Sequence, residues 1–434
     1  MKLLVVNPSG AGVYYYRTFL PHKNLSDKID ITFKEEIVEN EEELFDYDLI
    51  HFHTTIVAFE KMPSLFARLK KSGIKVIMDL DDLWEIPKTH HKYAYFKKIG
   101  LSESIKQNMR LADALTVTSE YLADKAKVYN RNVHVIENGI DFSEDQFKIK
   151  KSDKEKLTYG LITGSSHRND VELLRGLSNK LFVKYKNDIA TLICGFDLRG
   201  SEYGYNYLQG EFLEDLKTYN ILTNEMVDKI ERYNGVIARI KNFPKALVIK
   251  YNGAVSGTPY KKPITPQKSV WYFYERILTN DYDNIQDSNY LDFLMRFENK
   301  EYFNKNVNHR RIFTKPVNEF ASSYNELDIS LAPLVNTPFN VCKSNLKQLE
   351  AGAFKKPIIC SEVYPYTIDG IDGENCFIVP NKKPKLWFKC MQKLIDSEQL
   401  RIDMGEKMHE VVKNKYDINV LNEKRLDLYE KLIK

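Results

Sequence analysis

Short apolar runs alternate with helical segments along this chain, in two separate series. In the first series the apolar runs are residues 2–7, 48–53, 75–79, 114–118 and 133–136. Helical segments stand between them, such as Met62 to Ser72, which Gly73 then ends. Strands that alternate with helices are joined by crossover connections and run parallel. The pattern therefore predicts a doubly wound α/β domain.

A second series of the same kind begins near Leu157. Its apolar runs are residues 157–162, 189–194, 311–313, 328–332 and 357–360. The polar, charged run from Asp141 to Lys156 separates the two series and has the composition of a linker. The alternation weakens between Gly195 and His309, and we interpret about residues 200–308 as an insertion.

The predicted domains are therefore residues 1–150 and 151–385, followed by C-terminal helices over residues 386–434. Two Rossmann-like domains that face each other form a cleft, and ligands bind where the carboxyl ends of the strands point into it.

Composition and charge exclude several classes of protein. Hydrophobic residues make up 43 % and charged residues 29 % of the 434 positions, as in ordinary globular proteins. No run approaches the ~18 apolar residues of a membrane span, and the N-terminal apolar run is too short for a signal peptide. The net charge of +4 is too small to indicate nucleic-acid binding by itself. Five cysteines without a CxxC pair favour reduced, buried thiols in a cytoplasmic protein over disulfides or a zinc site.

Two glycine-containing turns each follow a predicted strand and precede a helix. Gly10 and Gly12 lie in the first turn, and Gly164 and Ser165 lie in the second. Glycines let backbone N–H groups approach an anion at a helix N-terminus. Either turn alone is equally well explained as a tight connection. Two such turns that open into one cleft indicate a phosphate site more strongly.

Side chains that follow the two turns are further candidates for binding the same ligand. Arg168 could pair with a phosphate through two hydrogen bonds, and His167 could contact the ligand or cap the helix. In the first helix some of three consecutive tyrosines must face the core. Only Tyr16 and Arg17 are therefore taken as candidates.

The segment from residue 339 to residue 352 carries the most specific pattern. Lys343 and Lys347 are four residues apart and are predicted to share a helix face, with Glu350 three residues further on. Lysines and a serine at a helix start suit a diphosphate, and a carboxylate one turn later suits a ribose diol. The alternative is a solvated amphipathic helix whose leucines face the core.

Three further segments carry motifs of one enzyme family. They are residues 135–141 (VIENGID), 349–361 (LEAGAFKKPIICS) and 373–380 (GENCFIVP). These resemble the family patterns V-I-P-N-G-V-D, E-A-M-A-x-G-x-P-V-I-A-S and G-E-N-G-L-L-V-P. With these motifs in order over both halves, the chain resembles the GT-B glycosyltransferases of the retaining family 4, also called group 1. Residues 10–17, 79–87 and 343–350 resemble a subgroup frequent in bacteriophage and bacterial surface-sugar clusters.

The resemblance implies a GT-B fold, in which two Rossmann-like domains face each other across a cleft. It implies transfer of a sugar from a nucleotide diphosphate sugar to a hydroxyl acceptor, with retention of configuration. The C-terminal domain is expected to bind the nucleotide and the N-terminal domain the acceptor, and the last helices to cross back onto the N-terminal domain. Domain closure would exclude water and limit hydrolysis of the donor.

The resemblance also assigns roles to individual residues of the segment around Lys343. Glu350 matches the carboxylate that holds the donor ribose in the family. The stretch Lys343, Ser344, Asn345 and Leu346 matches the one that supplies backbone amides to the donor. The first glutamate of the family's pair falls at Cys342, which cannot act as a carboxylate.

The family's catalytic histidine is also absent, and its place falls near Asp79 or Asp81. Clustered acids after a strand usually mark a ligand site. We predict that Asp81, or alternatively Asp79, orients or deprotonates the acceptor hydroxyl. Asp82 is expected to be a structural or helix-capping acid. His53, at the end of the neighbouring strand, is a third catalytic candidate.

Charge arguments predict that the reaction needs no metal and no other cofactor. Arg168, Lys343 and Lys347 suffice to stabilise a leaving diphosphate. The three acids after the third strand would also suit Mg²⁺.

Other functions fit the same residues. A phage DNA glycosyltransferase would modify hydroxymethylated pyrimidines on a flipped base, with the basic, aromatic residues between Lys245 and Tyr272 tracking the backbone. Such an enzyme would act in the host cytoplasm. A catalytically silent sugar-nucleotide binder fits the substitution at Cys342, and an epimerase on the same fold is a weaker option. The acceptor thus remains a glycan, a lipid-linked sugar or a modified DNA base.

Overall fold

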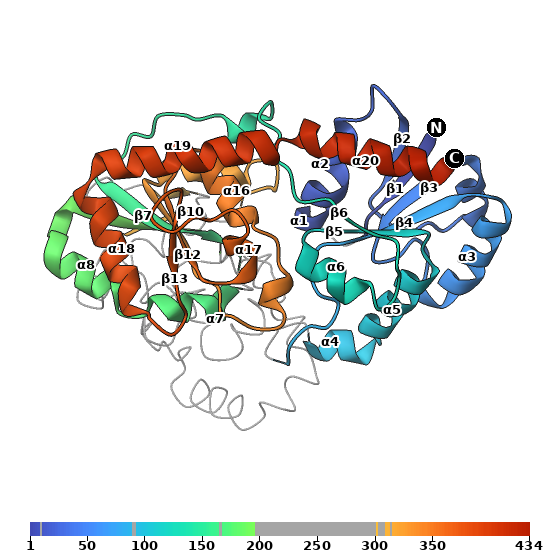
Figure 1. Cartoon of the computed structure of the whole chain (residues 1–434), viewed down its shortest axis with the longest axis horizontal. Coiled ribbons are helices and arrows are strands. Elements are labelled where there is room, and N and C mark those ends of the chain that lie inside the picture. The colour runs from blue at the N-terminus through green and yellow to red at the C-terminus, as the bar shows by residue number, and fades with distance from the viewer. Residues whose placement is uncertain (9–10, 89–92, 165–166, 196–300, 303–308, 313–314) are drawn as a thin grey trace, which may run out of the picture.

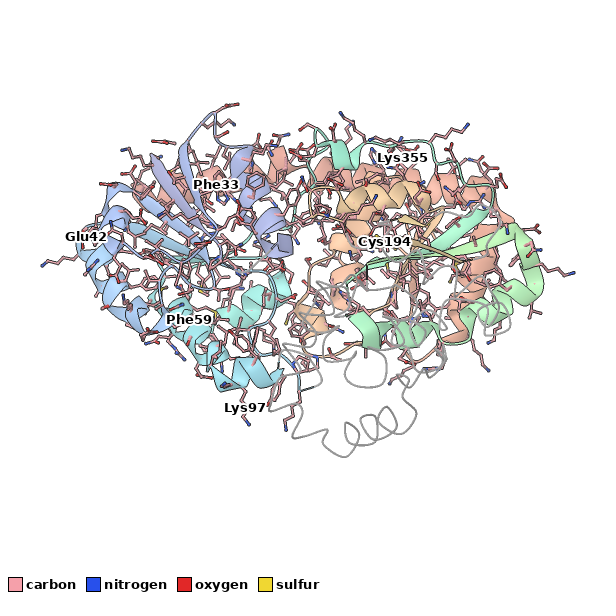
Figure 2. All side chains as sticks on the ribbon, turned by 180° about the vertical axis from the view of Figure 1, so that it is seen from behind. Phe33, Glu42, Phe59, Lys97, Cys194 and Lys355 are labelled. Carbon is pink, nitrogen blue, oxygen red and sulfur yellow. The ribbon has the colours of Figure 1, made fainter. Side chains whose placement is uncertain are left out.

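The computed structural model describes residues 1–8, 11–88, 93–164, 167–195, 301–302, 309–312 and 315–434. Nearly all of the predicted insertion, including the basic, aromatic stretch from Lys245 to Tyr272, lies outside these ranges. The described residues form two α/β halves that lie side by side, each built around one sheet (Figure 1). Seen from behind, Cys194 lies within the C-terminal half, whereas Glu42 and Lys97 point outward from the N-terminal half (Figure 2).

Six parallel strands form the sheet of the N-terminal half, in the order β2-β1-β3-β4-β5-β6. The strands are β1 (Lys2–Val6), β2 (Asp30–Lys34), β3 (Leu49–His53), β4 (Lys75–Leu80), β5 (Ala114–Val117) and β6 (Val133–Val135). The helices between them are α1 (Ala11–Val13), the π-helix η1 (Tyr14–Phe19), α2 (Leu20–Lys23), α3 (Met62–Lys71), α4 (Tyr93–Lys98), α5 (Leu101–Leu111) and α6 (Glu120–Ala126).

The apolar runs of this sheet are buried on both faces. Side chains alternate between the faces along a strand, so Leu4 and Val6 pack in a cluster that includes α3 and α5. Leu3 and Val5 face the opposite side and pack with side chains of the C-terminal helix α20 (Ile418–Ile433). Burial on both faces explains why these strands read as continuous apolar runs rather than as an alternating pattern.

Seven strands form the sheet of the C-terminal half, in the order β13-β12-β11-β7-β8-β10-β9. The strands are β7 (Leu157–Thr163), β8 (Ile189–Gly195), β9 (Glu301–Tyr302), β10 (His309–Ile312), β11 (Ile329–Ala332), β12 (Ile358–Ser361) and β13 (Phe377–Val379). All neighbours are parallel except β9 and β10. The described helices are α7 (Arg168–Val171), α8 (Leu177–Tyr185), α16 (Leu346–Ala353), α17 (Tyr364–Thr367), α18 (Lys385–Asp396) and α19 (Glu398–Lys415). The predicted α/β class with two parallel Rossmann-like sheets is confirmed.

Helix α16, which carries the predicted donor residues, packs closely against α19. A Cβ added at Gly352 would lie 2.7 Å from Val412 Cγ2 and 2.8 Å from Met408 Cγ, so only glycine permits this approach. The close contact fixes the position of α16 beneath the long helix, and thereby the position of the side chains at its N-terminal end.

Helices α19 and α20 run along one side of the molecule, from the C-terminal half to the N-terminal half (Figure 1). Between them the chain pairs with the segment that leaves β6. Ile140 donates its N–H to the carbonyl of Tyr416, and Ile418 donates to the carbonyl of Ile140, at 2.8 and 2.9 Å. The two connections between the halves therefore lie side by side.

Several properties expected from composition can be examined in the described residues. All five cysteines are among them, and no two form a disulfide. Among the described helices, none is both long and apolar enough to cross a membrane. Within the same ranges, His, Cys, Asp and Glu side chains form no group of three or more with the arrangement of a metal site.

Candidate active site

Side chains from the two halves meet where the carboxyl ends of both sheets face each other. Among the described residues, three polar contacts join the halves there. The Lys343 ammonium pairs with Asp82 at 3.2 Å, Asn138 donates its amide to Ser344 Oγ at 3.0 Å, and the Tyr16 hydroxyl donates to Glu350 Oε1 at 3.0 Å. Residues that are hundreds of positions apart in the sequence therefore form one candidate site.

Glu350 is the most enclosed member of this site, with 1 % of its side chain exposed. Its Oε1 accepts from Tyr16, and its Oε2 accepts from the Tyr324 hydroxyl at 3.1 Å and from the Lys347 ammonium at 3.0 Å. Burial, together with the charge of Glu350, holds the pKa of both tyrosines well above their usual range. Both carboxylate oxygens are thus hydrogen-bonded, as a buried charge requires.

Lys343 stands just before helix α16, and not on its face as predicted. The helix begins at Leu346, while Lys343 has extended backbone after the short 3₁₀ turn of residues 340–342. The prediction of a shared helix face with Lys347 was therefore wrong. Burial lowers the pKa of Lys343, but the nearby carboxylates, with Asp82 foremost, outweigh it, so its net pKa is raised.

The segment between Lys343 and Lys347 positions the start of α16 at the site. Asn345 occupies the N-cap position, but its side chain donates to the Tyr416 hydroxyl at 3.0 Å instead of capping the helix. In the described residues no side chain caps the first N–H groups of α16. These groups are therefore available to an anion at the helix N-terminus.

Cys342, where the family has its first glutamate, is fully buried. It packs in the hydrophobic cluster of the N-terminal half, and burial raises the pKa of its thiol to about 11. The cysteine therefore acts as a small apolar residue at the contact between the halves.

His167 is held by a carboxylate behind it. Its Nδ1 lies 2.9 Å from Asp170 Oδ2, and Asp170 Oδ1 accepts from the N–H of Val335 and from the Asn340 amide. The imidazole and Lys347 line a small hollow at the carboxyl ends of β7 and β11. Burial lowers the pKa of His167, although Asp170 opposes the shift.

The other residues of the two predicted turns are only partly described. Gly12 lies in α1 with open space around its Cα, and the exposed Gly164 follows β7. Gly10 and Ser165 lie outside the described residues. Arg168 begins α7, and only its backbone is described.

Asp79 and Arg17 form a buried ion pair, each with 1 % of its side chain exposed. Arg17 donates to both oxygens of Asp79, at 2.6 and 3.0 Å, and Thr116 donates to Oδ1 at 2.7 Å. Nη1 of Arg17 donates to Ile136 O and to Asn138 Oδ1. Burial opposes ionisation of Asp79, but Arg17 outweighs it and lowers the pKa to about 2. The pair fastens the first helical segment to the end of β4.

Asp81 differs sharply from Asp79 although it is only two residues away. Its side chain is half-buried, and within the described ranges its carboxylate accepts no hydrogen bond. Burial, followed by the charges of Asp82 and Asp79, raises its pKa to about 7, against the opposing effect of Arg17 and Lys343. A carboxyl group that changes protonation near neutral pH is suited to acid–base chemistry.

His53 ends β3 beside these acids. Burial lowers its pKa to about 4, so the ring is neutral at pH 7. Its Nδ1 lies 2.7 Å from Oγ1 of Thr54, whose φ of 69° is a strained value for a β-branched residue. Asn108 donates its amide to the Thr54 carbonyl at 3.0 Å and holds this turn.

Several residues that shape the site could not be predicted from the sequence. A threonine in a sequence does not predict a left-handed backbone such as that of Thr54. No local pattern indicates that Tyr324 bonds Glu350 or that Asp170 bonds His167. Asn138 lies in the family motif of residues 135–141, which marks the residue as functional but does not predict its contact with Ser344.

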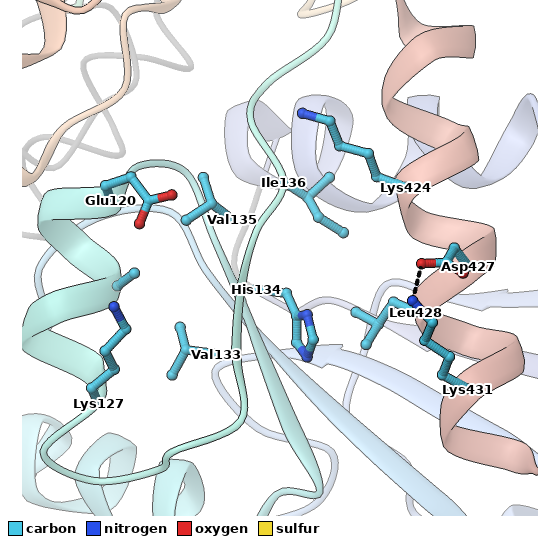
Figure 3. Close-up of a pocket in the computed structure, with 11 residues that line it drawn as sticks. Glu120, Lys127, Val133, His134, Val135, Ile136, Lys424, Asp427, Leu428 and Lys431 are labelled. Carbon is cyan, nitrogen blue, oxygen red and sulfur yellow. Dashed lines mark hydrogen bonds and ion pairs between the residues drawn. The ribbon is translucent and has the colours of Figure 1, made fainter.

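A separate cavity of about 360 Å³ lies between α6, β6 and α20 (Figure 3). Its wall includes His134 and Leu428, and none of the predicted site residues lines it. Two of its lysines are already paired, Lys431 with Asp427 at 2.5 Å and Lys424 with Glu137 at 3.1 Å. The candidate site is therefore the one at the facing strand ends.

Two protein-family models match the chain, one in each half. Residues 7–144 match the model of Glycosyltransferase Family 4, and residues 295–397 match that of glycosyl transferases group 1. One curated relative is the D-inositol 3-phosphate glycosyltransferase of Corynebacterium glutamicum (strain R). It is 30 % identical over 92 residues, which is 21 % of this chain and 21 % of that protein. The aligned region thus spans about a fifth of the relative's length.

Solved structures resemble the chain over its whole length. Sucrose-phosphate synthase from Thermosynechococcus elongatus has a TM-score of 0.57 at 12 % identity, over 100 % of this chain and 99 % of that one. A glycosyltransferase from Rickettsia africae has a TM-score of 0.53 at 11 % identity, over 100 % and 98 %. Anabaena HepE, in complex with UDP and glucose, has a TM-score of 0.52 at 10 % identity, over 99 % and 100 %. At these identities the likeness concerns the fold alone.

Proposed function

Because this chain belongs to the glycosyltransferases of family 4 and group 1 and has their GT-B fold, we propose that it transfers a sugar from a nucleotide diphosphate sugar to a hydroxyl acceptor with retention of configuration. One observation carries the proposal. Lys343 of the C-terminal half pairs with Asp82 and acts electrostatically on Asp81, and Glu350 of the same half accepts from Tyr16 of the N-terminal half.

This arrangement assigns one substrate to each domain. The N-terminal domain, residues 1–150, binds the acceptor. The C-terminal domain, residues 151–385, binds the donor and carries the insertion of about residues 200–308. The helices of residues 386–434 tie the two domains together. Closure of the cleft assembles the site and excludes water.

On the donor side, positive groups converge on the place of the diphosphate. Lys343 and Lys347 supply positive charge, His167, whose pKa burial lowers, supplies a neutral imidazole, and the uncapped start of α16 (Ser344, Asn345, Leu346) adds backbone N–H groups and a helix dipole. On the sequence pattern of the two turns, Gly164 and Ser165 with Arg168, and Gly10 and Gly12 of the other domain, belong to the same proposed donor site. Glu350 binds the ribose diol. HepE holds UDP, which supports a uridine nucleotide as the donor.

On the acceptor side, Asp81 is the proposed catalytic residue. Its carboxylate receives the proton of the acceptor hydroxyl, or hydrogen-bonds that hydroxyl, while the bond from the sugar C1 to the diphosphate breaks and the bond from C1 to the acceptor oxygen forms on the same face. Asp79 is engaged with Arg17 and Thr116, so it positions the strand end instead. His53, neutral and adjacent, contacts the acceptor.

The leaving diphosphate gains negative charge as the glycosidic bond breaks. Lys343 and Lys347, together with the N-terminus of α16, supply positive charge at that point. These groups do the work that Mg²⁺ would otherwise do, and we propose that the reaction requires no metal.

The acceptor and its location belong to the same proposal. The resemblance of residues 79–87 and 343–350 to enzymes of bacterial surface-sugar and bacteriophage clusters supports a glycan or lipid-linked sugar as the acceptor. The five cysteines without a disulfide support a cytoplasmic site of action.

The test is mass spectrometry of products after incubation with a panel of sugar nucleotides and three acceptor classes: oligosaccharides, lipid-linked sugars and hydroxymethylated DNA. We expect donor hydrolysis or transfer that Glu350→Ala abolishes. Transfer to DNA, lost steeply as salt rises, would favour the DNA-modifying alternative. Nucleotide binding without hydrolysis or transfer would identify a silent binder and refute the proposed activity.

A further inference from the structure

Three groups assigned to the donor in the proposed function are already bonded to the acceptor domain. Lys343 pairs with Asp82, Ser344 accepts from Asn138, and Glu350 accepts from Tyr16. The donor therefore enters a site whose ligands have partners across the cleft. A ligand that uses the same groups must displace those partners or share them.

The pair of Lys343 and Asp82 is the most direct case of such competition. Asp82 Oδ2 lies 3.2 Å from the Lys343 ammonium, with 36 % and 19 % of the two side chains exposed. The ammonium also lies 4.9 Å from the centroid of the Phe339 ring. A diphosphate seated on this ammonium would bring its negative charge close to the Asp82 carboxylate. Two like charges cannot both hold the cation without repulsion.

Asp82 also stands beside the proposed catalytic acid. The charged groups that act on Asp81 are Asp82 and Asp79, which disfavour its ionisation, and Arg17 and Lys343, which favour it. When Lys343 turns toward a diphosphate, the positive charge that it contributes to this group is neutralised. Asp81 then accepts a proton more readily.

We propose that Asp82 is a latch residue, which competes with the donor diphosphate for Lys343 and thereby sets donor affinity and links donor binding to the acceptor site. The proposal rests on the proposed function, because it takes Lys343 as a diphosphate ligand. Release of the latch strengthens Asp81 as a proton acceptor only once the donor is bound.

The test is calorimetric titration of UDP at low salt into five proteins: wild type, Asp82→Asn, Lys343→Ala, the double variant and Glu85→Gln. Asp82→Asn removes the competing charge with little change of shape, so UDP should bind about two- to five-fold more tightly, as expected for a partly exposed ion pair. The double variant should bind UDP like Lys343→Ala alone, because the latch acts only through this lysine.

Glu85→Gln is the matched control. Glu85 lies three residues further along the same loop and pairs with Lys106 at 2.6 Å, so its removal changes the loop charge without touching Lys343. We expect unchanged UDP affinity in this variant. An equal gain in Glu85→Gln and Asp82→Asn would mean that the charge of the loop, and not the latch, sets the affinity.

The remaining outcomes separate the two proposals. Unchanged UDP affinity in Lys343→Ala would overturn the donor-site assignment itself. Weaker UDP binding in Lys343→Ala, with no gain in UDP affinity in Asp82→Asn, would overturn the latch but support the donor-site assignment. A gain in UDP affinity in Asp82→Asn that persists in the double variant would also overturn the latch.

Discussion

Replacing Asp79 by asparagine is expected to destabilise the protein strongly, because it leaves the Arg17 guanidinium buried without a counter-charge. Both side chains are 1 % exposed, and two N–H groups of Arg17 bond the two carboxylate oxygens. Removing one partner of a buried pair costs about 3–5 kcal/mol, since the other charge stays desolvated. The neutral acceptors Ile136 O and Asn138 Oδ1 remain but cannot balance that charge.

The pKa of Asp79 gives a second, smaller measure of the same interaction. A pKa lowered from 3.8 to about 2 corresponds to about 2–3 kcal/mol in favour of the folded, ionised form. This figure compares the charged and neutral acid at a fixed site, whereas the Asn variant also leaves Arg17 permanently unpaired. The loss on mutation should therefore exceed it.

The assay is urea unfolding followed by circular dichroism at several pH values. Because the folded-state pKa of Asp79 lies below its unfolded value, its stabilisation is fully present above pH 4 and is lost as the pH falls toward 2. The difference in free energy of unfolding between wild type and Asp79→Asn should therefore be largest near neutral pH and shrink below pH 4.

Asp81→Asn is the internal control, since this half-buried carboxylate accepts no hydrogen bond within the described residues. Because the pKa of Asp81 is raised in the folded protein, its ionised form disfavours folding, so this variant should be at least as stable as wild type above pH 4. A loss below about 1 kcal/mol in Asp79→Asn, or a difference that does not depend on pH below 4, would refute the assignment of Asp79 as a structural partner of Arg17.

Three further outcomes follow from the same geometry. Asp81→Asn should lower turnover by roughly 10²–10⁴-fold with donor affinity little changed. The wild-type kcat/KM should fall below pH 7, where the Asp81 carboxyl takes up a proton, and the variant should lack this fall. Steady-state kinetics with a known donor measures both effects. Lys347→Ala should weaken UDP binding by about 1–3 kcal/mol in calorimetry while leaving the circular dichroism spectrum unchanged. Thr54→Gly relieves the strain of a φ of 69° and should change the free energy of unfolding by no more than about 1 kcal/mol. Turnover should still fall several-fold, because His53 loses the Oγ1 of Thr54 as its partner. Normal turnover in this variant would show that the turn has no part in catalysis.

Most of the sheet architecture was predictable because central parallel strands are apolar on both faces. The run at residues 75–79 became β4, Lys75–Leu80, and the run at 157–162 became β7, Leu157–Thr163. The strands that went unrecognised lie at sheet edges. In β2 (Asp30–Lys34) polar residues alternate with apolar ones and no side chain is fully buried, and β13 (Phe377–Val379) has only three residues. Partial exposure weakens the apolar signal on which the prediction depends.

The local arrangement around Lys343 was harder to predict than the strands. Spacing alone suggested a continuous helix through Lys343 and Lys347, yet the helix begins only at Leu346. Helix starts depend on a few backbone dihedral angles and on competing partners. Here the Asn345 side chain bonds Tyr416, which is brought close by the C-terminal helices, instead of capping the helix.

Strand burial and helix periodicity are local properties of the chain, so the two α/β halves, their order and the residue types that face the cleft could be inferred from the amino-acid sequence. It did not determine which carboxylate is available for chemistry. Asp79 and Asp81 are two positions apart and lie in the same local pattern, but only Asp79 meets Arg17, 62 residues earlier in the chain. The pairing of Tyr16 with Glu350 likewise spans 334 positions. The Arg17–Asp79 contact needs the folded N-terminal domain, and the Tyr16–Glu350 contact needs both domains packed together. Packing, not local pattern, therefore decides which charges are neutralised and which stay free to react.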